Sequence, residues 1–208
     1  QQAVSPLGLV PTMGYLHQGH LNLIRQARMD NKTLAVSIFV NPAQFGPDED
    51  FYAYPRNMEQ DLTLLAKENA DIVFLPTAED MYPSGFDTWV DPGKMANSLE
   101  GRCRPSHFRG VATIVAKLFN IVRPDRAYFG QKDGQQTLII KRLAADLNMG
   151  IEVVVLPTVR ELDGLAMSSR NMYLTSEQRK AAPLVYAALC YARDRWQNNV
   201  RNGERLRG

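Results

Sequence analysis

The sequence predicts an α/β protein built on a doubly wound, mostly parallel sheet. Short runs rich in β-branched residues alternate with longer segments of helical period along most of the chain. Such alternation is typical of parallel strands joined by crossover helices that cover both faces of a sheet. With 208 residues, 45% of them apolar, the chain is long enough for one complete domain and part of another.

The segments follow one another in the order that this fold requires. Strands are expected at 7–10, 33–40, 72–75, 88–90, 127–130 and 151–156. Helices are expected near 19–30, 57–69, 107–122 and 135–147. In the third of these helices apolar residues recur at steps of three and four, which predicts one buried face. Its members are Val111, Ile114, Val115, Leu118 and Val122.

A second, smaller domain is expected after Pro157, where the composition changes. Residues 158–175 are polar and rich in turn formers, and a single long helix is expected from about 176 to 199. We therefore expect a doubly wound domain over 1–158, then over 159–208 a linker and the first helix of an incomplete smaller domain. Because a lone helix cannot form a core, its apolar face should be exposed. That face contains Leu184, Ala188 and Tyr191.

Composition also narrows the class of protein. The apolar runs are far shorter than the roughly 20 residues that span a bilayer, and the N-terminus has no signal-peptide pattern. The net charge of +2 gives little support to a nucleic-acid partner. Cys103 and Cys190 belong to no CxxC pair. We expect a cytoplasmic protein with two reduced thiols, no nucleic-acid partner and no membrane association.

The loops that follow the strands are where a ligand is expected, because doubly wound sheets bind at the carboxyl ends of their strands. The first such loop, PTMGYLHQGHL, brings His17 and His20 to the start of the next helix. Free backbone N–H groups there favour a phosphate, and two imidazoles can stabilise charge on an α-phosphate under attack. Gly19 between them should let a nucleotide approach the backbone closely.

Two other interpretations of this histidine pair stay open. The side chains could serve packing or helix capping alone. The three-residue spacing could also suit zinc, although no third His or Cys lies in the motif.

Three later loops carry further candidate ligands. In FVNPAQF, Asn41 and Gln44 offer amides suited to a hydroxylated substrate, although Asn-Pro alone is only a turn signal. In YFGQKDGQQ, Lys132 could neutralise phosphates and Gly130 would admit them closely. In MSSRN, two hydroxyls and an arginine suit the β- and γ-phosphates of a nucleotide, or form a capping loop. The acidic loop PDEDF should be solvated surface, or bind Mg²⁺ through water.

Taken together, the motifs resemble the pantoate–β-alanine ligase family of the HxGH nucleotidyltransferases. They are PTMGYLHQGH, SIFVNPAQFGPDEDFYAYPR, HFRGVATIVAKLFNIVRPDRAYFGQKD and LAMSSRN, and the match extends from Leu9 to about Leu174. The resemblance implies a Rossmann-like fold and ATP-dependent condensation of pantoate with β-alanine, through a pantoyl adenylate and with release of AMP and pyrophosphate. It also implies Mg²⁺ and a homodimer.

The resemblance further implies roles for particular residues. His20 would be the proton donor, with His17 assisting at the α-phosphate, while Lys132 and the serines of MSSRN neutralise the departing pyrophosphate. Pantoate would be held by Gln44, which also lies near β-alanine, and by Gln136. The implied ATP site comprises Pro11, Thr12, Met13, Gly14, Tyr15, Leu16, His17, Gln18, Gly19, His20, Gly130, Gln131, Lys132, Asp133, Val159, Met167, Ser168, Ser169 and Arg170. The substrate site adds Asn41, Val111, Ile114 and Val115, the last three offering an apolar face to the methyl groups of pantoate.

The chain departs from the family pattern in three ways. Gly134 stands where many members have an aromatic residue, which would loosen the adenine side, and Gln131 replaces a common glutamate. The chain begins almost at its first expected strand, so the family's first helix is expected to be missing. The family's second domain, a lid over the site, should extend beyond Gly208. Some members of the family are fused to a cytidylate kinase.

Two alternative functions therefore stay open. One is a fragment that binds nucleotide or dimerises without efficient turnover. The other is an enzyme like the class I aminoacyl-tRNA synthetases, although Ala166-Met167 stands where those carry a lysine.

Overall fold

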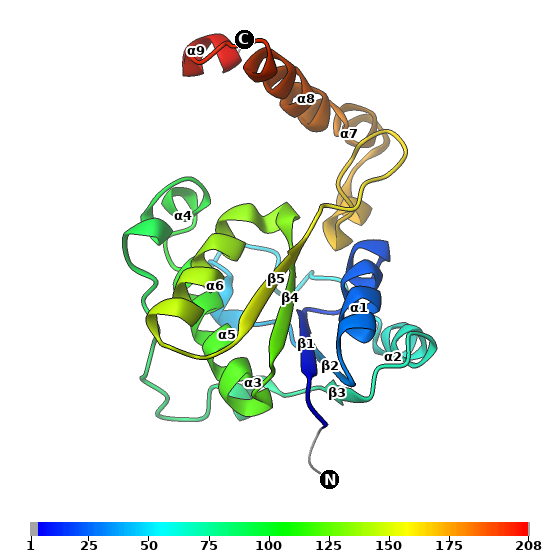
Figure 1. Ribbon diagram of the computed structural model, residues 1–208, viewed down its shortest axis with the longest axis vertical. Helices are drawn as coiled ribbons and strands as arrows, with labels where there is room; N and C mark the ends of the chain where they lie inside the picture. The colour runs from blue at the N-terminus through cyan, green and yellow to red at the C-terminus, as the bar shows by residue number, and fades with distance from the viewer. Residues whose placement is uncertain (1–3, 208) are drawn as a thin grey trace.

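Five parallel strands form one sheet in the computed structural model of the protein, which describes residues 4–207 (Figure 1). The order across the sheet is β3-β2-β1-β4-β5, so the direction of winding reverses beside β1. The predicted doubly wound parallel sheet is thereby confirmed. The strands are β1 (Leu7–Thr12), β2 (Thr33–Ile38), β3 (Ile72–Phe74), β4 (Arg126–Gly130) and β5 (Glu152–Leu156).

Helices cover both faces of this sheet, with α1 and α2 on one side and α5 and α6 on the other (Figure 1). Each face has its own apolar core, and the buried side of α5 contributes Val111, Ile114, Val115 and Leu118 to one of them, as the spacing predicts. The helices up to β5 are α1 (Gln18–Asp30), α2 (Met58–Lys67), α3 (Ala78–Met81), α4 (Glu100–Cys103), α5 (His107–Val122) and α6 (Gly134–Asp146).

β1 and β4 are paired only near the start of β1, so the sheet is open between them at its carboxyl edge. Along its full length β1 pairs with β2, from Leu7 opposite Thr33 to Thr12 opposite Ile38. Its pairing with β4 is confined to Gly8 and Leu9, so the last three residues of β1 have no partner there. The two strands therefore separate toward their carboxyl ends, at the switch point where a doubly wound sheet binds its ligand.

The strand expected at 88–90 is absent, which corrects the prediction. This segment is irregular, and its backbone N–H at Val90 donates to the side-chain hydroxyl of Thr113 on α5, 3.0 Å away. Trp89 stacks against Tyr82, and the guanidinium of Arg109 lies over its indole ring. The β-branched and aromatic residues thus pack on a helix instead of joining the sheet.

Beyond β5 the chain leaves the sheet and forms an arm of short helices (Figure 1). The single helix expected over 176–199 is wrong, because α7 (Ser176–Ala181) and α8 (Leu184–Gln197) are separate and α9 (Gly203–Arg207) follows. Pro183 lies at the break, where it lacks the N–H needed to continue the helix.

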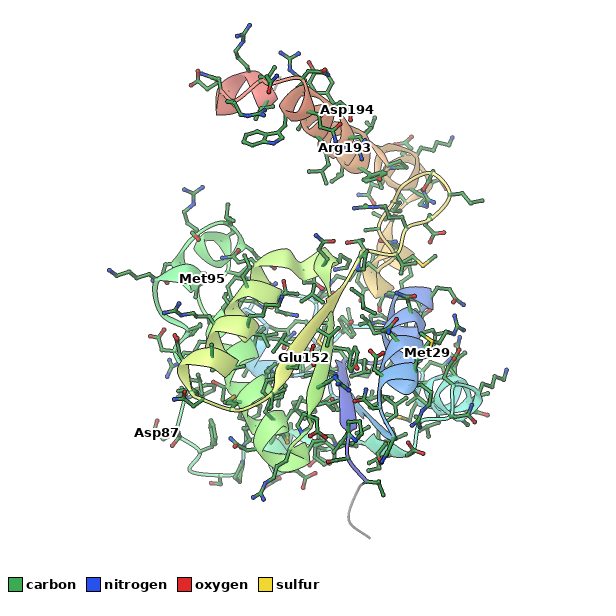
Figure 2. All side chains as sticks on the ribbon, in the orientation of Figure 1. Met29, Asp87, Met95, Glu152, Arg193 and Asp194 are labelled. Atoms are coloured by element: carbon green, nitrogen blue, oxygen red, sulfur yellow. The ribbon has the colours of Figure 1, made fainter. Side chains whose placement is uncertain are left out.

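Side chains of this arm lie largely in solvent, as Figure 2 shows for Arg193 and Asp194. The apolar face of α8 at Leu184, Ala188 and Tyr191 is exposed, as expected. A domain boundary near 158 stays a prediction. Within residues 4–207, no helix is both long and apolar enough to cross a membrane. Both cysteines are free thiols.

Candidate active site

Two connected hollows lie at the carboxyl ends of β1 and β4. The outer one has a volume of about 200 Å³, and the inner one, about 160 Å³, continues from it toward α5. They share Pro11, Met13, His20, Gln44, Phe129 and Gln136 among their walls. The opening between the two strands therefore leads into a divided cavity.

Most of the predicted site residues line this cavity. The outer hollow is bordered by Pro11, Met13, His17, Gly19, His20, Gln44, Gly130, Lys132, Asp133, Gln136, Val159, Met167, Ser168, Ser169 and Arg170. The inner hollow adds Thr12, Asn41, Val111, Ile114 and Val115. Neither hollow is lined by Gly14, Tyr15, Leu16, Gln18 or Gln131. The turn 14–16 lies behind the histidines, and Leu16 belongs to the apolar core on the α1 side.

The two histidines are held by the start of α1. His17 is the N-cap residue, and its Nδ1 accepts a hydrogen bond from the N–H of Gly19 at 3.1 Å. His20 Nδ1 accepts from the N–H of His17 at 3.3 Å, which completes a reciprocal capping box. Since both Nδ1 atoms accept, each neutral ring carries its proton on Nε2. Both histidines therefore cap the helix, and each ring keeps one N–H donor for the cavity.

Burial keeps this pair neutral. Loss of solvent, followed by the neighbouring His17 and Lys132, lowers the pKa of His20 to about 3. The pKa of His17 is also lowered, by burial first and then by Lys132. The ring centroids lie 4.1 Å apart. The pair therefore presents two neutral hydrogen-bond donors rather than two cations.

Gly19 makes room for the ring of His17. A Cβ atom at this position would lie 2.8 Å from Cε1 and 2.9 Å from Nδ1 of His17. The missing side chain thus makes room for the ring of the preceding histidine to fold back and cap the helix. Gly19 also borders the outer hollow, and a close approach of a nucleotide to its backbone stays a prediction.

Asn41 and Gln44 of the second loop have different roles. Asn41 is only 1% exposed, and its side chain donates to Gln44 and to the carbonyl of Gly110 while accepting from Tyr82 and from the N–H of Ala43. Its hydrogen-bonding capacity is committed within the protein. Asn41 therefore orients Gln44, whose Nε2 lies 3.2 Å from the Met13 sulfur at the cavity wall.

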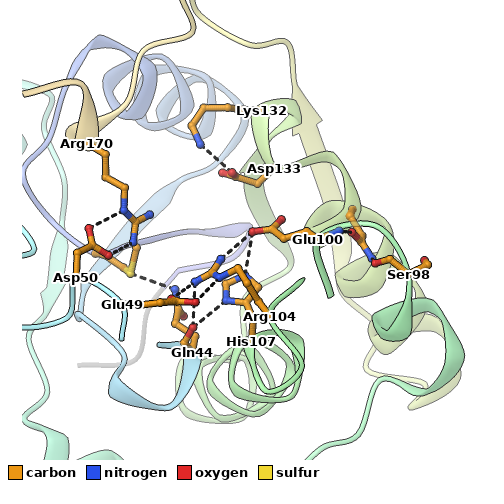
Figure 3. Close-up of polar contacts among 12 residues, drawn as sticks. Gln44, Glu49, Asp50, Ser98, Glu100, Arg104, His107, Lys132, Asp133 and Arg170 are labelled. Atoms are coloured by element: carbon orange, nitrogen blue, oxygen red, sulfur yellow. Dashed lines mark hydrogen bonds and ion pairs between the residues drawn. The ribbon is translucent and has the colours of Figure 1, made fainter. Parts of the chain in front are cut away.

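A further wall of the outer hollow was not identified from the sequence. Arg104 donates to both carboxylate oxygens of Glu49, to Glu100 and to the carbonyl of Gln44 (Figure 3). His107 donates its Nδ1 proton to the same carbonyl at 2.9 Å. Of these residues, His107 belongs to the HFR stretch and Glu49 to the acidic loop of the family motifs, whereas Arg104 lies in none of them. Partners 55 to 63 residues apart leave no local pattern.

The other two cations of the site also have carboxylate partners, as Figure 3 shows. Lys132 Nζ lies 2.8 Å from Oδ1 of Asp133. Arg170 binds Asp50 through two hydrogen bonds, and its guanidinium lies over the rings of Phe45 and Tyr54. The acidic loop is therefore not free solvated surface, which corrects that expectation.

Both serines of the MSSRN motif are engaged in the protein. Ser168 accepts from the N–H of Arg170 and caps the short 3-10 turn over Ser169–Tyr173. Ser169 donates its hydroxyl to the carbonyl of Tyr15, which ties this loop to the turn before the histidines. The predicted capping loop is thus present at the mouth of the cavity. Among residues 4–207, no three His, Cys, Asp or Glu side chains gather as metal ligands.

Comparison with known proteins identifies the family. The model of the family described as pantoate-beta-alanine ligase matches residues 1–206. The chain belongs to the pantoate–β-alanine ligase family. It is 58% identical over 201 residues to the pantothenate synthetase of Roseiflexus castenholzii, an alignment that covers 97% of this chain and 72% of that protein.

Solved structures of the family have the same fold. A pantoate–β-alanine ligase of Thermus thermophilus superposes with a TM-score of 0.94 at 51% identity, covering 98% of this chain and 74% of that one. The Francisella tularensis pantoate–β-alanine ligase, in complex with beta-gamma ATP and beta-alanine, gives a TM-score of 0.85 at 42% identity over 96% and 75% of the two chains. The protein is therefore a ligase of this family with the family's Rossmann-like nucleotidyltransferase fold.

Proposed function

We propose that ATP occupies the outer hollow and pantoate the inner one, and that the two react where the hollows meet. The observation that carries this proposal is the position of His20, which borders both hollows at the N-terminus of α1. The Francisella relative was solved with an ATP compound and β-alanine, which supports nucleotide binding by this protein.

The polar and apolar walls agree with this arrangement. The triphosphate would lie against α1, where the helix N-terminus and the two Nε2–H groups favour oxyanions. Lys132, Arg170 and the serine loop would receive the β- and γ-phosphates. Pantoate, a small hydroxy acid with two methyl groups, would place its hydroxyls near Gln44 and Gln136 and its methyl groups against the α5 residues of the inner hollow.

The proposed reaction has two steps, and each needs the reacting groups to be held close together. A carboxylate resists attack by an amine, so a pantoate carboxylate oxygen first attacks the α-phosphorus of ATP, and the bond to pyrophosphate breaks. The amine of β-alanine next attacks the carbonyl of the pantoyl adenylate and displaces AMP. We propose that His17 and His20 act as neutral donors to the α-phosphate in the first step, because burial holds the pKa of His20 to about 3. A well-placed donor of this kind is worth about 3 to 4 kcal/mol.

Mg²⁺ is expected to accompany the ATP. The carboxylates that border the outer hollow, Glu100 and Asp133, are already paired with Arg104 and Lys132. We therefore propose that phosphate oxygens and water supply most ligands of the ion, which is the usual environment of Mg²⁺. A homodimer and a cytoplasmic location stay predictions from the family.

The proposal is tested by supplying substrates in sequence. With ATP and pantoate alone the protein should release pyrophosphate and retain a bound acyl adenylate, detectable by mass spectrometry after acid quenching. Adding β-alanine should then release AMP and pantothenate. Pyrophosphate release that needs an amino acid and tRNA in place of pantoate would support the synthetase alternative, and nucleotide binding without pyrophosphate release would support the non-catalytic one.

A further inference from the structure

A buried carboxylate lies directly behind the turn that presents the histidines. Asp61, on α2, is only 2% exposed. Its Oδ1 accepts from the N–H of Leu16 at 2.7 Å, and its Oδ2 accepts from the N–H of Tyr15 at 2.8 Å. Within residues 4–207, none of the ion pairs includes it. Because aspartate is almost never fully buried unless paired, these two backbone donors must compensate for much of its lost hydration.

The turn that Asp61 holds has an unusual backbone. Gly14 has a φ of +82° and Tyr15 a φ of +52°, both in the left-handed region. For a tyrosine this conformation costs roughly 1 kcal/mol and persists only where the surroundings impose it. A Cβ atom at Gly14 would lie 2.9 Å from Oδ2 of Asp61, so the carboxylate occupies the space that this glycine leaves. Asp61 and the left-handed turn therefore fit each other.

The residues that directly follow this turn include the two histidines of the proposed chemistry. His17, the N-cap of α1, comes directly after Leu16, and His20 is linked to it by the capping box. The carbonyl of Tyr15 accepts from Ser169 of the serine loop. A shift of the turn would therefore move both imidazoles and the anchor of the loop together.

We propose that Asp61 is a positioning residue for adenylation, which fixes through the N–H groups of Tyr15 and Leu16 the direction in which His17 and His20 enter the cavity. The inference rests on the proposed function, in which these histidines act at the α-phosphate. Asp61 touches no substrate in this account. Its effect is transmitted by two hydrogen bonds and one turn of backbone.

A purely structural role predicts a different outcome. Asp61 lies in the first turn of α2, where a carboxylate also stabilises the helix terminus, so any substitution will lower stability to some degree. A positioning role adds a selective loss of the chemical step, since a displacement of about 1 Å can cost about 100-fold in rate. The test therefore has to separate rate, binding and stability.

Asp61→Asn is the first variant, because asparagine has nearly the same shape but replaces one acceptor oxygen by an amino group. We expect kcat for pyrophosphate release to fall about 10- to 100-fold. KM for pantoate should change by less than about 3-fold, because the amides proposed to bind it lie on other elements. The matched control is Asp125→Asn, which removes a carboxylate that accepts from the N–H of Leu7 at the opposite end of β1. Its kcat should equal that of the unmodified protein.

A second readout needs no turnover. The chain contains three histidines, so the imidazole signals in a ¹H–¹⁵N spectrum can be assigned to His17, His20 and His107. In Asp61→Asn the signals of His17 and His20 should shift while that of His107 stays in place. If Asp61→Asn does not fold, Asp61→Glu, which keeps both acceptor oxygens, serves for the same comparison.

An unchanged kcat, or a reduced kcat with unshifted signals of His17 and His20, would overturn the positioning role. If the unmodified protein releases no pyrophosphate from ATP and pantoate, the proposed function fails instead. In that case the imidazole spectra still decide whether Asp61 orients the histidines.

Discussion

The guanidinium of Arg170 lies edge to edge with the carboxylate of Asp50. Nε is 2.7 Å from Oδ2 and Nη2 is 2.8 Å from Oδ1. This pairing lowers the pKa of Asp50, chiefly through the hydrogen bonds from Arg170. It occupies one edge of the guanidinium and leaves Nη1 unbound by Asp50, so an ordered donor remains for a phosphate.

Asp50→Asn should therefore weaken ATP binding. Loss of the two-pronged contact lets Arg170 sample other rotamers, and reordering such a side chain costs roughly 0.5–1.5 kcal/mol. We expect Kd for ATP, measured by calorimetry, to rise about 2- to 10-fold, since 1.4 kcal/mol corresponds to tenfold. Asp146→Asn, which breaks the exposed pair with Arg142 on α6, is the control and should leave Kd unchanged. Tighter binding by Asp50→Asn would mean that the carboxylate only competes with phosphate.

The histidines can be replaced without removing their caps. Asn at position 17 and Gln at position 20 supply acceptor oxygens of the kind that N-cap and N3 positions favour, so α1 should persist. We expect His17→Asn and His20→Gln each to lower the rate of pyrophosphate release about 100- to 1000-fold, because the amide does not hold its NH2 donor at the position of the imidazole Nε2–H. Near-normal rates with either variant would exclude that histidine from the chemical step.

Acid should destabilise the protein through His20. Its pKa is about 3 in the folded state and 6.5 as a free side chain, so between these values the unfolded chain binds a proton that the folded chain does not. This contribution to stability is complete above pH 6.5 and is lost as the pH falls toward 3. We expect urea unfolding to show a loss of up to about 1.4 kcal/mol per pH unit relative to His20→Gln in this window. Parallel curves for the two proteins would show that His20 is not neutral in the fold.

The amides of the inner hollow should discriminate between the two substrates. Gln44→Ala or Gln136→Ala leaves polar groups of pantoate unmatched in a buried site, at a cost of about 1–3 kcal/mol. The affinity for pantoate should therefore fall about 5- to 150-fold while that for ATP changes little. Equal losses for both ligands, measured by calorimetry, would contradict a pantoate role.

Two glycines should respond to alanine in opposite ways. A Cβ at Gly110 would lie 2.1 Å from the carbonyl oxygen of Ala43 and 2.7 Å from the backbone nitrogen of Gln44, whereas a Cβ at Gly134 would meet nothing within 4 Å. Gly134, at the start of α6, has a helical φ of −57°. We expect Gly134→Ala to raise the free energy of unfolding by about 0.5–1 kcal/mol.

By contrast, Gly110→Ala should lower the free energy of unfolding by roughly 1–3 kcal/mol, as overpacking does. It should also weaken pantoate binding, because α5 would push the Gln44 loop outward. Thermal unfolding of both variants, with pantoate calorimetry on Gly110→Ala, checks the pair. A well-folded Gly110→Ala with normal pantoate affinity would show that this close approach does not matter.

Many residues of the site could be predicted from short stretches of sequence. His17 and His20 lie within one turn of helix, and Lys132 and the MSSRN residues follow the ends of strands or precede a turn. Parallel strands bring their carboxyl ends to one edge, so loops after different strands converge there without any further information. The periodicities of 3.6 and 2 that define helices and strands are properties of short windows, and for this reason the sheet and its main helices were predicted.

Local patterns in the sequence were enough to predict the class of fold, the four loops and, through long motifs, the family. The pairing of charges, and the groups that hold others in place, became visible only in the folded protein. Asp61 reaches Tyr15 across 46 residues, Arg104 reaches Glu49 across 55, and Arg170 reaches Asp50 across 120. Such partners are chosen by packing between elements, because a buried or half-buried charge is stable only where another chain segment supplies its hydrogen bonds. No short window of sequence contains that information, and for this reason the acidic loop was predicted to be surface and Asp61 was not singled out.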